Sequence, residues 1–267
     1  MSKTILITGA GAGLGKGAAF ELARQGHRVI ATTHCGGRAE KLKAEAAEQG
    51  LTLETVKLGI TNVEDCQAAF ARFGAKVDVV VANAAIGDSG PVAEVDVDRI
   101  RNVFEFNVFS TVEFVQPYAQ VFARRRRGKV IFVSSVAGVL SYPYLVPYTA
   151  SKHALEAIAE LMREELQPMG VQVATLNLGT SRTEFDDRMY DKMDEWYDPA
   201  TSITPPEAIR NVRDLFAGDE LQMDPQPMID KMAEVIAADN HKFRTVFPER
   251  AIKDAQDYQQ KYWTLEV

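Results

Sequence analysis

The sequence predicts an α/β fold of the Rossmann type, a doubly wound and mostly parallel sheet in a three-layer α/β/α sandwich. Apolar runs alternate with helical patterns, which indicates βαβ units. The runs are near-continuous in Val, Ile and Leu, as in strands buried on both faces. They lie at residues 5–8, 28–32, 51–58, 77–81, 130–133 and 171–176. A chain of 267 residues with 46% hydrophobic content suits one domain with one core, residues 1–267.

The spacing of apolar residues predicts the helices between these strands. A first helix is expected at 16–25, directly behind a glycine-rich turn. The segment 99–116 carries an apolar stripe with Asn107 inside it, and a second stripe covers 148–167 between two prolines. A buried amide must find partners, and taken alone Asn107 would be interpreted as a core amide satisfied by the backbone.

The helical pattern dissolves at 183–206 into Asp, Met, Tyr and Trp with three prolines. A long irregular segment inside a compact domain is usually functional, so we expect a substrate-binding loop or lid at 184–210. Packing or a dimer contact is the alternative role for its apolar residues. The chain then ends in an atypical C-terminal extension, 240–267. The elements expected after the lid are helices at 206–216 and 228–237, a strand at 243–247 and a polar helical end.

A formal net charge of −7 and a pI near 5.3 give no general attraction to nucleic acid or to an anionic membrane surface. The one basic run, 124–127, is interpreted as a solvated helix end, where cations interact favourably with the helix dipole. Cys35 and Cys66 fit neither a metal nor a redox spacing, so we expect no metal site and a reducing compartment. No apolar stretch approaches membrane-spanning length, and we expect a cytoplasmic protein with small-molecule partners.

The first apolar run leads into a glycine-rich turn and then into a helix. Glycines there permit a tight turn, let backbone amides approach a pyrophosphate and aim the helix N-terminus at the phosphates. A plain tight turn is the alternative, which the order of strand, glycines and helix disfavours. The residues of this candidate dinucleotide site are Thr8, Gly9, Ala12, Gly13, Leu14 and Gly15.

The end of the second strand bears on the choice of dinucleotide. An Asp or Glu there binds the ribose 2′-hydroxyl of NAD, whereas basic or small polar residues admit the 2′-phosphate of NADP. The chain has Thr33, His34 and Arg38 here and no carboxylate within 31–38. This favours NADP(H) over NAD(H); the alternative is a loop whose charges face water.

Tyr148 and Lys152 lie four residues apart on an expected helix, so both side chains share one face. A neighbouring ammonium and an oxidised nicotinamide both favour the phenolate of a tyrosine, which can then exchange a proton as hydride moves. Upstream, the fifth apolar run ends in Ser134 and Ser135, where a hydroxyl can orient the reacting oxygen. A solvated surface pair is the alternative for the tyrosine and the lysine.

Over residues 3–183 the sequence resembles the short-chain dehydrogenase/reductase family, in its single-domain Tyr-x-x-x-Lys subgroup. The motifs that carry the resemblance are Thr-Gly-x-x-x-Gly-x-Gly at 8–15 and Tyr-x-x-x-Lys at 148–152. The family's active-site serine precedes the tyrosine by thirteen residues, which implies Ser135 rather than Ser134. The resemblance also implies that Tyr148 is the general acid/base. It implies further that Lys152 tunes the tyrosine and holds the nicotinamide ribose, and that Asn107 helps to hold a water.

The resemblance assigns further cofactor contacts. The family's Asn-Asn-Ala-Gly segment corresponds to 82–85, its Pro-Gly after the sixth strand to 178–179, and its adenine-contacting aspartate is replaced by a glycine. The implied contacts are Gly59, Ile60, Asn83, Ala84, Ala85, Tyr148, Lys152, Gly179, Thr180 and Thr183. The family's Asp-Gly-Gly ending is absent. Because that ending builds a tetramer interface in many relatives, we expect a homo-oligomer that is either a dimer or a tetramer.

These observations predict an NAD(P)-dependent oxidoreductase that interconverts a secondary alcohol and a ketone or aldehyde. Expected substrate contacts are Ser135, Tyr142, Tyr148, Phe185 and Met189, with Tyr144, Tyr190, Met193, Trp196 and Tyr197 as further walls for an apolar or aromatic substrate. One rival is a cofactor-independent lyase that resembles the halohydrin dehalogenases, which would lack the glycine turn and the lysine. The other is a non-catalytic nucleotide-sensing relative, which would tolerate loss of the tyrosine or the lysine.

Overall fold

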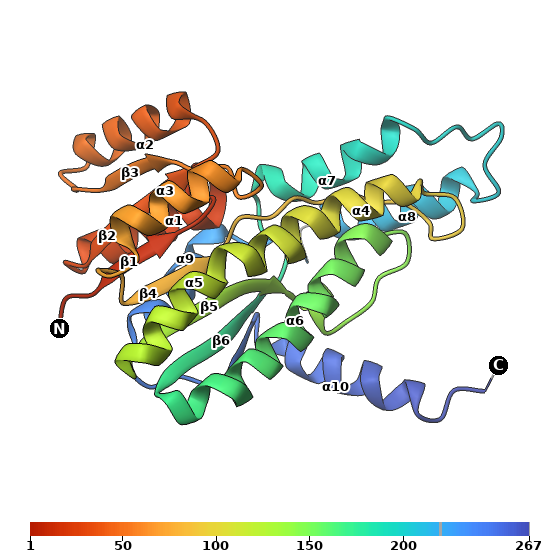
Figure 1. Cartoon of the computed structure of the whole chain (residues 1–267). Coiled ribbons are helices and arrows are strands. Elements are labelled where there is room, and N and C mark those ends of the chain that lie inside the picture. The colour runs from red at the N-terminus through yellow and green to blue at the C-terminus, as the bar shows by residue number, and fades with distance from the viewer. Residues whose placement is uncertain (219–220, 267) are drawn as a thin grey trace.

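Seven parallel strands form a single sheet in the order β3-β2-β1-β4-β5-β6-β7 (Figure 1). The structure, a computed structural model, describes residues 1–218 and 221–266. The strands are β1 (Thr4–Ile7), β2 (Arg28–Thr33), β3 (Glu54–Lys57), β4 (Val79–Ala82), β5 (Gly128–Ser135), β6 (Val171–Leu178) and β7 (Arg244–Phe247). The predicted Rossmann-type fold is confirmed. The strand order reverses between β1 and β4, where such sheets bind ligands at their carboxyl edge.

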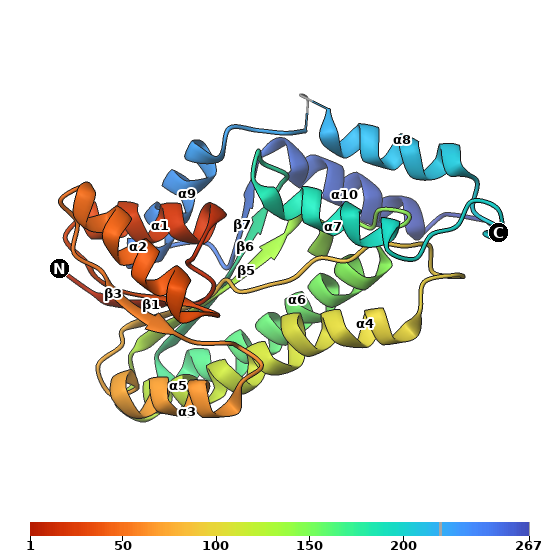
Figure 2. The same ribbon diagram turned by 90° about the horizontal axis from the view of Figure 1, so that it is seen from above.

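Helices cover both faces of the sheet (Figure 2). The helices on one face are α1 (Gly13–Arg24), α2 (Gly36–Glu48) and α9 (Pro225–Ala237), and those on the other are α3 (Val63–Phe73), α5 (Ser110–Arg125) and α6 (Val146–Leu166), which ends in the 3₁₀ turn η3 (Gln167–Met169). Alternate strand residues point to opposite faces, so Ile5 and Ile7 join one apolar cluster and Leu6 the other. This double burial explains why the strands read as near-continuous apolar runs.

The helix expected at 99–116 belongs to a longer helical run with a defect at its centre. α4 (Val97–Phe104) and α5 are joined by a π-helical segment, η1 (Glu105–Phe109), and Asn107 is its middle residue. A regular helix was therefore the wrong expectation for these five residues. A π-turn inserts an extra residue into the helix, and such segments are frequent at functional sites.

The expectation of an irregular segment at 183–206 is wrong for its first half, which is helical. α7 (Glu184–Asp194) begins directly after Thr183, and α8 (Pro206–Ala217) follows the irregular residues 195–205. Phe185, Met189 and Met193 recur four residues apart, the spacing of an amphipathic helix. The Asp-rich composition obscured this pattern. Both helices extend the molecule on the side opposite to α2 (Figure 1).

The C-terminal extension joins the sheet. β7, predicted at 243–247, pairs in parallel with β6, and α10 (Arg250–Tyr262) follows it. Ala251 and Ala255 of α10 pack against the 3₁₀ turn η2 (Val136–Gly138) that follows β5. The extension therefore supports the turn directly behind Ser135.

The basic run 124–127 closes α5 and leads into β5, as predicted. Arg126 adopts a left-handed φ of 54°, and Arg125 donates to the Val77 carbonyl at 2.5 Å. Across residues 1–218 and 221–266, no helix has the length and apolarity that a bilayer crossing requires. The same residues contain no group of three His, Cys, Asp or Glu side chains that could hold a metal ion.

We predict that Gly17→Ala destabilises the fold, because α1 and α9 touch at this glycine. A Cβ at Gly17 would lie 2.2 Å from Cδ1 and 2.6 Å from Cγ1 of Ile229. Overpacking should lower the free energy of unfolding by about 1–3 kcal/mol, despite the better helix propensity of alanine. Denaturant unfolding followed by circular dichroism measures the difference.

The matched control is Gly37→Ala in α2, where a Cβ would meet nothing within 4 Å. Its stability should be unchanged or slightly higher. Ile229→Ala should partly restore the stability of Gly17→Ala. Equal effects of the two glycine substitutions would contradict this packing account.

Candidate active site

The glycine-rich turn after β1 is fastened to the segment after β4. Thr8 Oγ1 accepts hydrogen bonds from the backbone N–H groups of Asn83 and Ala84, each at 2.9 Å. Gly9 has a φ of 65°, which favours glycine, and a Cβ there would lie 2.8 Å from Cα of Ala84. Ala85 follows and is half-buried. The two segments expected to bind a dinucleotide therefore touch at the carboxyl edge of the sheet.

Asn83 closes the turn from the side. Its amide donates to the carbonyls of Thr8 at 2.9 Å and Gly9 at 3.3 Å. A Cβ at Gly15 would lie 2.4 Å from Asn83 Nδ2, so only glycine fits there without a shift. The sequence predicted that these residues share one site, but it did not predict that the Asn83 amide contacts the turn directly.

The N-terminus of α1 points out of the same turn. The N-cap residue Ala12 offers no side-chain cap, and the first turn holds no acidic residue. The first N–H groups of the helix are therefore open to an anion. Leu14 anchors the helix start to the core. Thr183, the N-cap residue of α7, lies opposite this turn, with its Cβ 3.9 Å from the Cβ position of Gly13.

The end of β6 borders a small cavity. The N–H of Gly179 donates to a β7 carbonyl at 2.7 Å, and Thr180 Oγ1 donates to the Leu221 carbonyl at 2.5 Å. Among the residues that line the cavity are Val136, Leu140, Tyr142, Thr180 and Phe216. The cavity thus joins a predicted cofactor segment to a predicted substrate residue, Tyr142.

The end of β2 lies beside the glycine-rich turn. A Cβ at Gly11 would lie 3.2 Å from Cγ2 of Thr33 and 3.7 Å from Cδ of Arg38. His34 and Arg38 are both exposed. Arg38 is therefore close enough to the turn to meet a group bound there.

Gly59 and Ile60 follow the neighbouring strand β3. The N–H of Gly59 donates to the Asp65 carboxylate at 2.9 Å, and Asn62, the N-cap of α3, accepts from the N–H of Asp65 at 2.8 Å. Asp65 was not identified from the sequence as a residue that holds this segment. The Asn-x-x-Asp spacing of a helix start, related to a capping box, was the signal that could have found it.

Tyr148 and Lys152 lie buried on one face of α6, as their spacing predicts. The Lys152 ammonium lies 5.6 Å from the centre of the Tyr148 ring and donates to the Val133 carbonyl at 2.9 Å. Ser135 ends β5 two residues later, and its Oγ accepts from the N–H of Ala137 at 3.1 Å. Ala137 belongs to the apolar cluster that contains Tyr148. The three predicted catalytic groups therefore gather at the carboxyl edge of the sheet.

Burial controls the charge of the lysine. Desolvation lowers the pKa of Lys152 to about 8, and the Glu156 carboxylate acts in the opposite direction. An ammonium with this pKa is mostly charged at neutral pH yet close to its titration. Perturbed groups of this kind cluster at functional sites.

Both the oxygen and the nitrogen of the Asn107 amide are hydrogen-bonded. Its Oδ1 accepts from the N–H of Ile86 at 2.9 Å, and its Nδ2 donates to the Ile86 carbonyl at 2.9 Å and to Ser151 Oγ at 3.0 Å. The amide is therefore paired with the backbone of Ile86 and with the Ser151 hydroxyl. Ser151, buried between the tyrosine and the lysine, donates in turn to the Tyr148 carbonyl at 2.7 Å. No motif singled out Ser151 in the sequence.

Apolar side chains surround the Tyr148 ring. Its ring centre lies 5.6 Å from that of Phe185, and Leu145, Met189, Tyr190 and Phe216 complete the buried cluster, with Tyr142 against it. Trp196 and Tyr197 lie elsewhere: a Cβ on Gly90 would touch Trp196, and Tyr197 donates to the Thr204 carbonyl at 2.7 Å. The apolar residues expected in the lid therefore divide into a group beside Tyr148 and a second group, in which Trp196 lies against Gly90 and Tyr197 bonds to Thr204.

Comparison with known proteins assigns the family. The model of short chain dehydrogenases matches residues 3–194. The chain belongs to the short-chain dehydrogenase family. Its relatives include human retinol dehydrogenase 8, 29% identical over 246 residues (88% of this chain, 78% of the relative). An (S)-acetoin-forming diacetyl reductase of Staphylococcus epidermidis is 32% identical over 198 residues (72% and 77%).

A solved short-chain dehydrogenase/reductase from Burkholderia phymatum, in complex with NAD, has the same fold. The TM-score is 0.81 at 22% sequence identity, and the match covers 100% of this chain and 98% of that one. The likeness therefore extends over β7 and α10, beyond the residues that the family model matches.

In this short-chain dehydrogenase, polar contacts fasten α7 to the segment after β4. Ser89 Oγ donates to the Met189 carbonyl at 2.8 Å. Arg99 of α4 donates to Asp88 at 2.9 Å and to Glu195, just after α7, at 2.6 Å. Because the Asp88 side chain is only 7% exposed, this pair is less screened than a surface ion pair.

We predict that Arg99→Gln loosens α7. Loss of both ion pairs should make the backbone amides of α7 exchange about fivefold faster, as expected for a loss near 1 kcal/mol in local opening. Hydrogen–deuterium exchange by mass spectrometry measures this. Arg101→Gln, which breaks an exposed pair within α4 itself, is the control and should leave the exchange of α7 unchanged. Equal protection of α7 in both variants would show that Arg99 does not hold α7 in place.

Proposed function

We propose that the chain is an NAD(P)-dependent dehydrogenase that interconverts a secondary alcohol and a ketone or aldehyde, with Tyr148 as general acid/base. The observation that carries the proposal is the buried Lys152 ammonium beside the Tyr148 ring, at the sheet edge that also bears the glycine-rich turn. The similarity to proteins named as a retinol dehydrogenase and a diacetyl reductase supports it.

The residues of the turn fit a dinucleotide. Gly9 and Gly13 have positive φ, a side chain at Gly9 or Gly15 would collide with the 83–84 segment, and the uncapped start of α1 offers N–H groups to a pyrophosphate. When bound, the nicotinamide accepts or donates the hydride. The proposed contacts outside the turn are Gly59, Ile60, Asn83, Ala84, Ala85, Gly179, Thr180 and Thr183, with Tyr148 and Lys152.

In the reducing direction, Ser135 donates a hydrogen bond to the substrate oxygen and Tyr148 gives it a proton. Ser135 Oγ already accepts from Ala137, which orients the hydroxyl and leaves its proton for the substrate. Lys152, charged below its pKa of about 8, favours the phenolate that remains. In oxidation the same groups act in reverse.

Asn107 acts in this proposal through α6. Its amide donors go to Ile86 and Ser151, and Ser151 holds the Tyr148 carbonyl, so the amide fixes the start of the catalytic helix. The water-holding role that the resemblance implies for Asn107 stays a prediction from the sequence.

The cluster around Tyr148 favours a substrate with an apolar or aromatic body, with Tyr142, Phe185 and Met189 as proposed contacts. The basic residues at the end of β2 favour NADP(H). A dimer or tetramer and a cytoplasmic location stay predictions from the sequence.

Tyr148→Phe should abolish turnover, because it removes the proton that the substrate oxygen exchanges. We expect kcat to fall about 100-fold or more, followed as nicotinamide absorbance with both cofactors and a panel of ketones, aldehydes and secondary alcohols. Tyr197→Phe, which loses only a bond to the Thr204 carbonyl, is the control and should retain activity. Wild-type rates in Tyr148→Phe would refute the assignment, and product formation without cofactor would favour the lyase alternative.

Arg38→Ala should change the choice of cofactor. We predict that the affinity for NADP(H) falls about tenfold, because a charge-assisted bond to the 2′-phosphate is lost, while the affinity for NAD(H) is unchanged. Quenching of intrinsic fluorescence measures both dissociation constants. Lys41→Ala, an exposed cation farther along α2, is the charge-matched control. Tighter binding of NAD(H) than of NADP(H) by the wild type would overturn the preference.

A further inference from the structure

A buried carboxylate lies behind the catalytic pair and has no part in the mechanism above. Glu156 follows Lys152 by four residues, about one turn of α6, and only 4% of its surface is exposed. Burying a carboxylate is costly unless charged and polar groups compensate it. The groups that compensate Glu156 therefore indicate what its charge does.

Two later strands supply those groups. Arg244 of β7 donates to Glu156 Oε2 through Nε at 3.1 Å and Nη2 at 2.8 Å. Asn177 of β6 donates to Oε1 at 2.7 Å. The fully buried Asn177 also donates to the Ser135 carbonyl at 3.0 Å. One carboxylate thus connects the edge strand of the sheet with the residue that ends β5 in the site.

A row of four side chains leads from the buried Tyr148 to the surface. Tyr148, Lys152, Glu156 and Glu160 recur every four residues on α6, and each step turns about 40° around the helix axis. Arg244 Nη2 closes the row, because it also donates to Glu160 at 2.7 Å.

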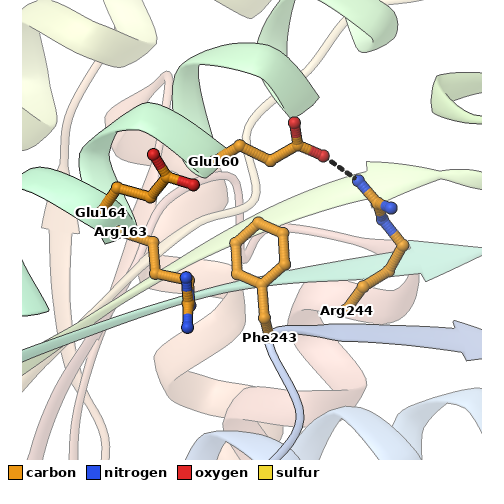
Figure 3. A pocket seen from close by; sticks show the side chains of 5 residues that line it. All are labelled: Glu160, Arg163, Glu164, Phe243 and Arg244. Atoms are coloured by element: carbon orange, nitrogen blue, oxygen red, sulfur yellow. Dashed lines mark hydrogen bonds and ion pairs between the residues drawn. The ribbon is translucent and has the colours of Figure 1, made fainter.

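The outer end of the row opens on a surface pocket. Figure 3 shows Arg244 joined to Glu160, with the Phe243 ring between Arg244 and Arg163. Each guanidinium carbon lies 5.7 Å from the ring centre. The Arg244 side chain is 32% exposed, so the cation that compensates Glu156 meets solvent, whereas the carboxylate itself is buried.

We propose that Glu156 is a positioning residue for the reaction: its charge keeps Lys152 protonated, and Arg244 sets how strongly Lys152 experiences that charge. This inference rests on the proposed function of Tyr148 and Lys152. It assigns a role to a residue that touches neither substrate nor cofactor.

The surroundings of Lys152 support this assignment. Burial lowers the pKa of Lys152 to about 8, and Glu156 opposes that shift. The charged or titratable neighbours of Lys152 along the row are Tyr148, Glu156 and Glu160 on α6, and Arg244 on β7 ends the row. The neighbouring elements contribute neutral groups: the Val133 carbonyl from β5, the Asn177 amide from β6 and the Asn107 amide from η1. The alternative is a purely structural tie between α6 and β7, which would affect stability without changing protonation.

Charge substitutions separate the two roles. Glu156→Gln keeps an oxygen for Asn177 but removes the charge, so Lys152 should titrate about one unit lower. Arg244→Gln removes the cation beside Glu156, and the titration of Lys152 should move upward. Glu160→Gln removes an exposed carboxylate from the same guanidinium and is the matched control, with a much smaller shift. Glu156→Asp, which retains the charge, should move the titration back toward the wild type.

The primary readout is an NMR titration of the protein without cofactor, with ¹³C at lysine Cε and the Lys152 signal assigned by its loss in Lys152→Met. The second is the pH profile of kcat/KM for alcohol oxidation. In the proposed mechanism the Lys152 charge favours the Tyr148 phenolate, so the limb that rises with pH should shift in the same directions.

Shifts of opposite sign in Glu156→Gln and Arg244→Gln would support the proposal. Lower Tm values with an unchanged Lys152 titration would reduce Glu156 to a structural tie and overturn it. If the titration shifts as expected but the wild type turns over no alcohol or carbonyl, the proposed function fails while the charge coupling stands.

Discussion

Burial of the Lys152 ammonium is the constraint on which the rest of the site depends. A buried cation is costly unless polar groups surround it, and here the Val133 carbonyl lies at 2.9 Å with Glu156 one turn behind. β5 supplies that carbonyl and ends in Ser135, and α6 carries Tyr148. The strand and the helix cannot shift against each other without unpairing the charge. The ammonium thus fixes the hydroxyl and the phenol in one place.

Close packing determines the geometry around the glycine-rich turn, whereas charge determines the geometry around Lys152. Gly9 and Gly15 leave no room for a Cβ because the 83–84 segment fills it, and Thr8 Oγ1 holds that segment with two hydrogen bonds at 2.9 Å. Backbone packing of this kind sets where N–H groups point without any charged side chain. Arg38, near the start of α2, lies beside this turn and is exposed, so it can be changed while the turn stays intact.

The parts of this structure that the sequence predicted are those encoded by local spacing. Strand runs, the glycine turn and the Tyr148–Lys152 pair each lie within one short segment. α7 was missed although its apolar residues have helical spacing, because Asp and Pro dominated the composition. The Glu156–Arg244 pair spans 88 residues and depends on the register of β7, which no local pattern encodes.

The C-terminal extension contacts the carboxylate behind Lys152 although it lies outside residues 3–194. β7 is an edge strand, so it pairs with β6 alone, and the Arg244 ion pairs add to what holds its register. A slip by one residue would turn Arg244 to the opposite face and leave Glu156 buried without its cation. The register of this last strand is therefore coupled to the charge behind Lys152. A short-chain dehydrogenase can in this way tie its most distal segment to its chemistry without bringing that segment near the substrate.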